Sequence, residues 1–390
     1  MNYQAASSDY ANPEDFKHVY QGMPVLVTGH SGFTGGWLCQ WLIEAGAKVS
    51  GLSLPPVTSP NLHDLWNQDE LAPSEWRTIN EYTAVESAVD TNAPQVIFHL
   101  AAQPLVSRAY ENPLESFETN VMGTAHVLEA ARQSPSVNAV VCVTTDKVYA
   151  DQNWPWGYRE TDRLGGKDPY SASKSAAEMV TRAYQKTLSE RTNGVTISTA
   201  RGGNIIGGGD WSDNRIVPDF VRSRVQNKPL TLRQPNAIRP WQHVIALCHG
   251  YLSLGSYLLD NGADGAQNFN FGPLDEDTKT VGELVAALSE NWPGLDITYG
   301  ESDFFETDVL RWIARRPVNS WAGSLLWISN RRLRGPHNGI VITTPPPSRP
   351  VKFVVSKSPH IARLRLDVAA EHTRCRCRRF YRESPLQAPG

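Results

Sequence analysis

The stretch "MPVLVTGHSGFTGGWL", residues 23–38, decides the fold. Its apolar, β-branched beginning predicts a buried strand, and a helical stretch follows Gly29, Gly32 and Gly35. Glycine permits a tight turn, lets the backbone approach a pyrophosphate, and leaves helix N-terminal amides open to an anion. The spacing is G-x-x-G-x-x-G rather than G-x-G-x-x-G, but its position between strand and helix predicts a dinucleotide site.

Similar segments recur along the chain. Further apolar, β-rich runs begin at Lys48, Pro94, Asn138 and Gly194. Stretches with helical spacing lie between or after them, at residues 37–45, 113–132 and 170–188. Strands that alternate with helices, each strand nearly continuous in apolar residues, predict an α/β fold with a doubly wound (Rossmann-type) parallel sheet covered on both faces. Ligands of such folds bind at the carboxyl ends of the strands.

The run "VVCVTTDKVYA", residues 140–150, ends a predicted strand in chemically active side chains. Thr145, Asp146 and Lys147 place a hydroxyl, an acid and an amine at the edge where this fold class binds ligands. An ordinary polar boundary between strand and loop is the other interpretation of this triplet taken alone.

The run "DPYSASKSAAE" holds Tyr170 and Lys174 at the start of a helical stretch. Residues four apart share one helix face, so the ammonium lies near the phenol. A neighbouring positive charge lowers a phenol pKa, which predicts that Tyr170 acts as a base near neutral pH.

Several motifs together resemble the extended short-chain dehydrogenase/reductase family: the glycine turn, "HLAAQP", "TNVMGT", "TTDK", "YSASK" and "NIIGGGDW". Within that family, "WGYRETDRLGGKDPYSASK", "ARGGNIIGGGDW", "RIVPDF" and "IRPWQHV" are similar to the branch of CDP-glucose 4,6-dehydratases. The match runs from about residue 21 to residue 310. Lysine at position 147 favours this branch, because many sister dehydratases carry glutamate there.

The resemblance implies NAD as cofactor and CDP-glucose as substrate. NAD would contact Gly29, Gly32, Phe33, Gly35, Leu100, Ala101, Ala102, Tyr170 and Lys174. The sugar diphosphate would contact Asn204, Arg215 and Arg239, since the arginine fork matches phosphate oxygens. A surface ion pair is the alternative role for Arg215.

The resemblance also assigns the steps of the reaction. Tyr170 takes the proton of the sugar 4-hydroxyl while hydride leaves C4 for NAD, Thr145 steadies that oxygen, and Lys174 holds the nicotinamide ribose. Asp146 protonates the departing 6-hydroxyl, and Lys147 removes the C5 proton before hydride returns to C6. Asp146 must therefore keep a proton near neutral pH and Lys147 must lose one, which desolvation and neighbouring charges favour.

Two positions bear on cofactor binding. Only Ser53, and no carboxylate, closes the second strand where a ribose-binding acid stands in many dinucleotide folds, and no Arg offers itself to a 2′-phosphate. Thr78 stands where the family commonly has an aspartate near adenine. We therefore expect NAD rather than NADP, bound with reduced affinity.

Composition excludes several classes of protein. No run approaches eighteen apolar residues and the first 22 residues are polar, so we expect no membrane span and a cytoplasmic protein. Five scattered cysteines favour neither a disulfide framework nor a metal site. Residues 1–310 carry a net charge of −16, which argues against binding of nucleic acid. As in relatives, residues 113–132 and 170–188 would pair with their copies in a homodimer, or within a homotetramer.

The predicted organisation is an N-terminal extension (1–20), a mainly NAD-binding domain (21–200), a smaller, mainly nucleotide-sugar-binding domain (201–310) and an atypical tail (311–390). Two other functions stay open. One is a nucleotide-sugar 4-epimerase or a dehydratase for another nucleotide; the other is a non-enzymatic dinucleotide-binding regulator. An epimerase has no use for an acid and a base aimed at C6 and C5, so Asp146 and Lys147 favour elimination.

The tail differs from the body in charge. Residues 311–390 hold fourteen Arg and two Lys against three acidic residues, so the tail carries +13 and residues 1–310 carry −16. With one nucleotide restored after the Leu310 codon, codons exist that encode a family-like string in the neighbouring frame. We interpret this segment as a poorly ordered out-of-frame product; a genuine basic tail for an acidic partner is the rival interpretation.

Overall fold

The computed structural model of the 390-residue chain describes residues 13–66, 68, 72–152, 154, 156–188, 194–273 and 278–300, together with two short strands further along. The chain divides into two compact units, residues 1–332 and 333–390. In the second unit, β14 (Phe353–Val355) pairs antiparallel with β15 (Leu364–Leu366). Apart from this pair, the tail and its proposed change of frame lie outside the described residues.

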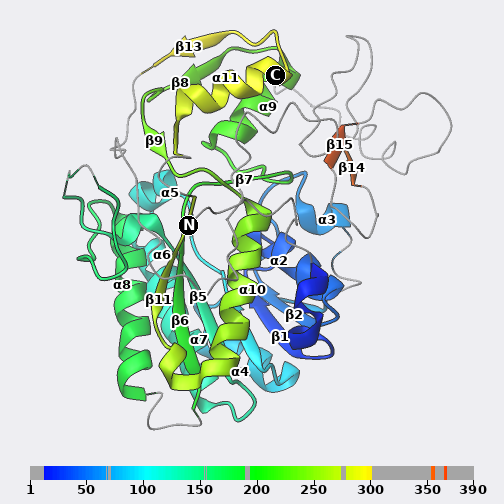
Figure 1. The fold of residues 1–390 in the computed structure, drawn as a ribbon, viewed down its shortest axis with the longest axis vertical. Helices are drawn as coiled ribbons and strands as arrows, with labels where there is room; N and C mark the ends of the chain where they lie inside the picture. Colours follow the sequence, from blue (N-terminus) through cyan, green and yellow to red (C-terminus); the bar gives the residue numbers. More distant parts are fainter. Residues whose placement is uncertain are drawn as a thin grey trace, which may run out of the picture. The chain divides into compact units, whose positions relative to one another are not determined.

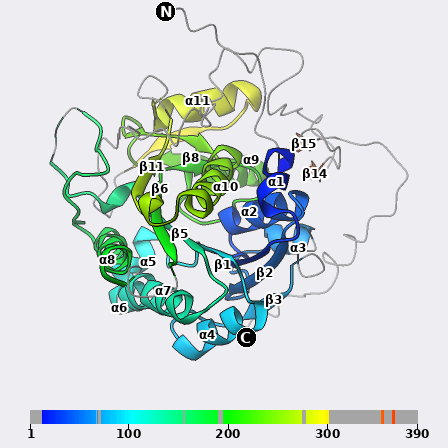
Figure 2. The same ribbon diagram turned by 60° about the horizontal axis from the view of Figure 1, so that its bottom comes forward.

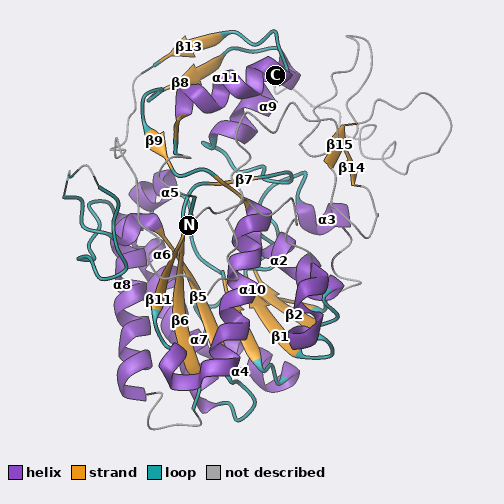
Figure 3. Cartoon of the chain, viewed as in Figure 1, coloured by secondary structure: helices purple, strands orange, loops and turns teal. Residues whose placement is uncertain are grey.

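The first unit is built on a seven-stranded sheet in the order β11-β6-β5-β4-β1-β2-β3, with parallel pairing throughout (Figures 1 and 3). The strands are β1 (Pro24–Thr28), β2 (Lys48–Ser53), β3 (Ser74–Trp76), β4 (Val96–His99), β5 (Ala139–Thr145), β6 (Thr196–Gly202) and β11 (Asn268–Phe271). The predicted doubly wound parallel sheet is confirmed. The register pairs Thr28 with His99 and Thr145 with Gly202, which brings the strands' carboxyl ends to one edge.

Helices cover both faces of the sheet, as Figure 2 shows. One face carries α1 (Lys17–Tyr20), α2 (Phe33–Glu44) and α10 (Val244–Asn261); the other carries α4 (Tyr82–Asn92), α7 (Gly123–Gln133) and α8 (Pro169–Ala183). Successive strand residues point to opposite faces, so Val25 and Val27 of β1 pack in the first core while Leu26 packs in the second. A strand buried on both faces must be apolar throughout, which explains the continuous runs in the sequence.

Three further α-helices of this part are short: α3 (Leu62–Trp66), α5 (Val106–Glu111) and α6 (Pro113–Phe117). A π-helical turn (Glu118–Met122) joins α6 to α7, and a second one (Tyr184–Leu188) extends α8. The predicted helical stretches 113–132 and 170–188 are therefore present, each with a π-turn that helical periodicity did not indicate.

A smaller group of elements gathers at one end of the unit (Figure 1). It comprises α9 (Ile216–Gln226), α11 (Val281–Asn291), β7 (Ile205–Ile206), β8 (Leu230–Leu232), β9 (Ile238–Arg239), β10 (Gln242–His243), β12 (Lys279–Thr280) and β13 (Ile297–Tyr299). A separate apolar cluster of Phe220, Leu230, Leu232 and Val285 holds it together. A capping box between Thr280 and Glu283 begins α11.

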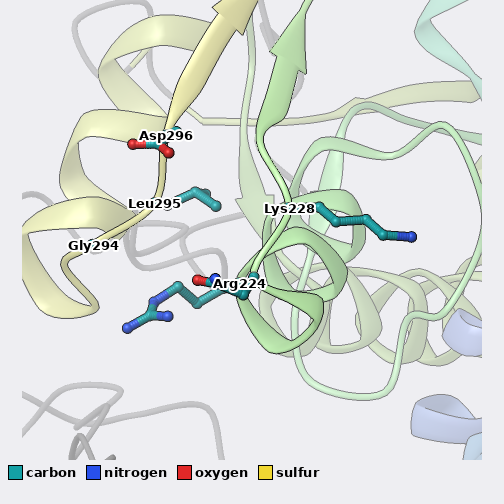
Figure 4. A pocket seen from close by; sticks show the side chains of 6 residues that line it. Arg224, Lys228, Gly294, Leu295 and Asp296 are labelled. Atoms are coloured by element: carbon teal, nitrogen blue, oxygen red, sulfur yellow. The ribbon is translucent and has the colours of Figure 1, made fainter.

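A cavity of about 40 Å³ lies in this smaller group, beside the end of α9 and the loop before β13 (Figure 4). Its lining includes Arg224 and Lys228, which lie where a helix C-terminus favours positive charge, and Asp296. Pockets for organic ligands measure about 300–1,000 Å³, so this cavity is a packing feature and not a substrate site.

Within the described part of the chain, no helix combines the length and apolarity that crossing a membrane requires.

Candidate active site

The glycine turn lies between β1 and α2. Gly29 has φ +73°, and a Cβ there would lie 2.6 Å from the backbone nitrogen of Ala101, so both conformation and space require glycine. A Cβ on Gly35 would lie 2.1 Å from the carbonyl oxygen of Gly29, so α2 packs against the turn only without a side chain. A Cβ on Gly32 would meet nothing nearer than the Gly29 carbonyl oxygen at 3.4 Å, so space stays open there.

The N-terminus of α2 fits an anionic ligand. Gly32 is its N-cap, no side chain caps the helix, and the first turn holds no acidic residue. The amides of the first turn can therefore hold a phosphate. The segment after β4 lies alongside: the Leu100 nitrogen donates to the Thr28 carbonyl (3.1 Å), and the Ala101 nitrogen donates to the Thr28 hydroxyl (3.2 Å).

Other predicted cofactor residues lie near this turn. Ala102 continues the segment that follows β4, and Phe33 begins α2. A Cβ on Gly207 would lie 3.2 Å from the Phe33 ring, so Phe33 also reaches the glycine-rich loop after β7. The open space above Gly32 and the uncapped helix are what a pyrophosphate needs, so these residues fit a bound dinucleotide.

Hydroxyls close the end of β2. The Ser53 and Ser31 hydroxyls bond to each other (2.7 Å), and Ser31 also donates to the Leu54 carbonyl (2.8 Å). Thr78 follows β3, and its hydroxyl accepts a bond from the Asn80 nitrogen (3.1 Å). Neutral groups therefore stand at both positions where the sequence departs from the acidic pattern.

Asp146 is buried directly after β5. The Thr145 hydroxyl donates to Asp146 Oδ1 (2.8 Å), and the Lys147 nitrogen donates to that hydroxyl (3.4 Å) in the short 3₁₀ turn Asp146–Val148. Asp146 is 5% exposed, and its Oδ2 has no hydrogen-bond partner among the described residues. Burial raises the pKa of Asp146, against the opposing effects of Lys147, the Thr145 bond and Arg239. This is the direction that a proton donor requires.

Tyr170 and Lys174 come from the start of α8. The helix begins with Asp168 as N-cap, whose side chain accepts from the Ser171 nitrogen, and with Pro169 at its first position. Both residues are buried, and the Thr145 hydroxyl lies close enough to the Tyr170 phenol to lower the pKa of that phenol. Tyr170, Lys174 and the triplet at the carboxyl end of β5 are thus brought together at one edge of the sheet.

The predicted lowering of the Tyr170 pKa by Lys174 is wrong for this structure. Burial raises the pKa of Tyr170 to about 12, and the opposing effects come from the nearby Thr145 hydroxyl and the charge of Arg215. The reason is one of direction: Lys174 Nζ donates to the Val143 carbonyl (3.1 Å), inside the end of β5. Burial lowers the pKa of Lys174 to about 8, although the charge of Glu178 opposes this.

The predicted substrate residues come from the smaller group. Arg239 is buried in β9, and its charge reaches Asp146; the charge of Arg215, the N-cap residue of α9, reaches Tyr170. Arg215 also forms an ion pair with Asp210 (3.3 Å), as the alternative role predicted. This ion pair does not prevent the Arg215 charge from acting on Tyr170. Asn204 is half-buried before β7, and its carbonyl accepts from the Gln242 nitrogen (2.9 Å).

Sequence reasoning missed Glu178, a fully buried carboxylate under the site. A signal existed, because Tyr170, Lys174 and Glu178 follow one another at intervals of four on one helix. The described residues include no cluster of three or more His, Cys, Asp or Glu side chains that could hold a metal ion.

A Rossmann-type parallel sheet, an open glycine turn and a Thr-Tyr-Lys set at the same sheet edge define an NAD-dependent enzyme of the extended short-chain dehydrogenase/reductase class. The sequence model of the NAD dependent epimerase/dehydratase family matches residues 25–268. The chain belongs to this family, which confirms the resemblance drawn from the motifs.

Individual relatives agree. The chain is 42% identical over 280 residues to the CDP-glucose 4,6-dehydratase of Salmonella typhimurium, covering 71% of this chain and 78% of that protein. The dTDP-glucose 4,6-dehydratase of Streptomyces venezuelae, solved with NAD, has TM-score 0.63 and 25% identity over 75% of this chain and 88% of that one. A UDP-glucose 4-epimerase of Thermus thermophilus, solved with NAD, shares the fold (TM-score 0.65, 23% identity, 75% and 91% covered).

Proposed function

We propose that this chain is a lyase that converts CDP-glucose to CDP-4-dehydro-6-deoxyglucose and water, a step that feeds deoxysugar synthesis for O-antigen-type polysaccharides. The observation that carries the proposal is the position of Asp146. A buried carboxyl with a raised pKa accepts a hydrogen bond from the Thr145 hydroxyl, and Thr145 and Asp146 both act on the pKa of Tyr170. Groups for oxidation and for elimination therefore share one site, on a chain 42% identical to a CDP-glucose 4,6-dehydratase.

Bound NAD supplies a hydride acceptor for C4 and later a donor for C6. Tyr170 takes the proton of the 4-hydroxyl as the C4–H bond breaks. The raised pKa of Tyr170 must fall for this role, and the nearby Thr145 hydroxyl and the Arg215 charge act in that direction. Lys174, held by the Val143 carbonyl, presents a buried ammonium for the nicotinamide ribose.

Elimination uses the two residues after Thr145. The 4-keto group acidifies the C5 proton, Lys147 removes it, and Asp146 gives its proton to the leaving 6-hydroxyl. Asp146 suits this step because burial favours its protonated form. Lys147 is half-buried on the same turn, which supports an acid and a base that act on adjacent carbons of one hexose.

For the substrate's diphosphate we propose Asn204, Arg215 and Arg239. Both arginine charges already reach catalytic groups, so a diphosphate bound by them would lie next to the reacting sugar. Residues 201–310 would form most of this half of the site and residues 21–200 most of the NAD half. The buried, unpaired Cys39, Cys142 and Cys248 are compatible with a reducing compartment, and we propose the cytoplasm.

We also propose a homodimer, or a homotetramer built from it. Large apolar side chains stand exposed on α6, the following π-turn and α8: Leu114 (83%), Phe117 (38%), Met122 (51%) and Met179 (57%). A concentration of exposed apolar side chains on neighbouring helices is typical of an interface between subunits. A second copy of the same face is the simplest cover.

A substrate panel tests the proposal. The chain is incubated with NAD and with CDP-, UDP-, dTDP- or GDP-glucose, and the 4-keto product is followed by its absorbance in base. Turnover of CDP-glucose, with no net reduction of NAD, is the expected result. Turnover of the other nucleotides alone would remove the cytidine assignment.

A further inference from the structure

Glu178 lies completely buried beneath the catalytic edge. Its Oε1 accepts bonds from the Thr144 hydroxyl and from Arg201 Nε (2.9 Å), and its Oε2 accepts from the Thr199 hydroxyl (3.0 Å) and Arg201 Nη2 (2.8 Å). The carboxylate thus joins α8 to the ends of β5 and β6. Thr144 is the neighbour of Thr145, so this bond fixes the strand end that presents the catalytic hydroxyl.

Arg201 extends the network away from the helix. Its Nη1 donates to the Tyr149 hydroxyl (2.7 Å) and to the Glu160 carbonyl (3.0 Å), and its guanidinium lies 5.1 Å from the centre of the Tyr149 ring. Tyr149 stacks on Tyr158 at 4.9 Å and donates to Asn270 Oδ1 (2.6 Å). The ion pair of Glu178 and Arg201 therefore anchors both ends of the segment 149–160, which follows the catalytic turn.

The ion pair is stable in its charged form. Burial alone would raise the pKa of Glu178, but the Arg201 charge and the bonds from Thr144 and Thr199 outweigh it, so this pKa lies below its usual value. Because its polar atoms are satisfied, the pair avoids the large cost of an uncompensated buried charge.

Lys174 lies one helical turn before Glu178 on α8. The charge of Glu178, on the same helix, favours the charged form of the Lys174 ammonium, while burial opposes it. Cys142 on β5 also faces the ammonium, but burial raises the pKa of that thiol to about 12, so it stays neutral. On β4, the charge of Lys174 helps to keep His99 neutral, with burial as the larger cause. Glu178 is the carboxylate among these neighbours.

We infer that Glu178 is a positioning residue for the oxidation half of the site. Its carboxylate fixes the strand end that carries Thr145, keeps the ammonium of Lys174 charged and, through Arg201, anchors the segment that begins at Tyr149. The inference rests on the proposed function only for the role of Lys174 at the nicotinamide ribose.

Glu178→Gln tests the inference by removing the charge and keeping the shape. NAD affinity is measured by tryptophan fluorescence across the neutral to basic range. With a Lys174 pKa of about 8, the parent should lose roughly tenfold in affinity between about pH 7 and about pH 9, as the ammonium is lost. In Glu178→Gln the loss should begin at lower pH, because the charge that supports the ammonium is gone.

The double variant Glu178→Gln/Arg201→Gln separates positioning from stability. It leaves no unpaired buried charge, so it should regain thermal stability relative to Glu178→Gln, while its midpoint for NAD affinity stays below the parent's. Leu128→Ala, a fully buried leucine on α7, is the control: it should unfold earlier and keep the parental midpoint.

Turnover of CDP-glucose gives the second measurement. In the double variant, kcat should fall at basic pH with KM little changed, since the substrate's own contacts remain. Parental midpoints in both Glu178 variants, or a parent whose NAD affinity does not vary with pH, would overturn the inference. A parent that shows the expected NAD behaviour without turning over CDP-glucose would overturn the proposed function and support the positioning role.

Discussion

Replacing Asp146 by asparagine removes an acid from the site while preserving its shape. The amide oxygen can accept the Thr145 hydroxyl as the carboxylate does at 2.8 Å, so Thr145 and Tyr170 keep their positions. The Oδ2 atom has no partner among the described residues, so the NH₂ group that replaces it breaks no existing bond. The variant therefore tests proton donation and little else.

The size of the effect follows from this geometry. A positioned general acid contributes about 10²–10⁴-fold to rate, which is roughly 3–5 kcal/mol in the barrier. Loss of the 6-hydroxyl should slow by that factor in Asp146→Asn. Oxidation at C4 should stay near the parental rate, because Tyr170 and Thr145 are unchanged.

Although Asp146→Asn should slow elimination, it should not lower the unfolding temperature of the chain at neutral pH. Burial raises the pKa of Asp146, so the folded chain binds this proton more tightly than the unfolded chain. The carboxyl group therefore stabilises the fold at acidic pH, and this contribution is lost as pH rises through the folded-state pKa. At neutral pH Asp146→Asn should unfold at a temperature equal to or above the parent's, and the difference should vanish in acid.

The assay is rapid mixing of the variant with NAD and CDP-glucose. Absorbance of reduced nicotinamide should rise and persist, while the base-absorbing ketone of the product forms slowly. Elimination at the parental rate would show that another group donates the proton. Absence of nicotinamide reduction would show that Asp146 acts in the oxidation, and either result would refute the assignment.

Three further predictions concern the base, the interface and the tail. Lys147→Met should still oxidise C4 but lose solvent exchange at C5, whereas Tyr170→Phe should stop the first hydride transfer; normal C5 exchange in Lys147→Met would assign the base elsewhere. By light scattering at micromolar concentration, the parent should have the mass of a dimer or larger, and Met179→Lys the mass of a monomer. The control Val225→Lys, at a similarly exposed position on α9 (64%), should keep the parental mass. A monomeric parent would contradict the proposed interface. Sequencing of the coding DNA should reveal a family-like string in the neighbouring frame after Leu310, and the restored chain should unfold at higher temperature; early stop codons in that frame would end the idea.

The sheet was predictable because its strands are buried on both faces. Val25, Leu26 and Val27 must all be apolar because alternate residues face opposite cores, so a continuous apolar run in the sequence predicts a strand. β3 and β11 escaped because they are short: β3 is largely polar, and the pattern "NFNF" of β11 has no long apolar run. The π-turn at Glu118–Met122 has the same hydrophobic spacing as the helices around it, so sequence periodicity did not distinguish it.

The site was predictable in its members but not in its electrostatics. Motif spacing predicted that Thr145, Asp146 and Tyr170 lie at one sheet edge. In the structure Thr145 hydrogen-bonds Asp146, and both act on the pKa of Tyr170. The sequence did not show that the Lys174 ammonium is directed to the Val143 carbonyl, because side-chain direction depends on packing. The partner of Glu178 was not predicted for a similar reason: Glu178 lies on α8 and Arg201 on β6, and only the fold brings the two together.

Internal hydride transfer is the central claim of this account, and an isotope label tests it directly. CDP-glucose carrying deuterium at C4 is converted with unlabelled NAD in ordinary water, and the product is examined by mass spectrometry and NMR. The account predicts deuterium at C6 of the 4-keto-6-deoxy product and a solvent proton at C5. Loss of the label to water, or a product that keeps its 6-hydroxyl, would contradict it.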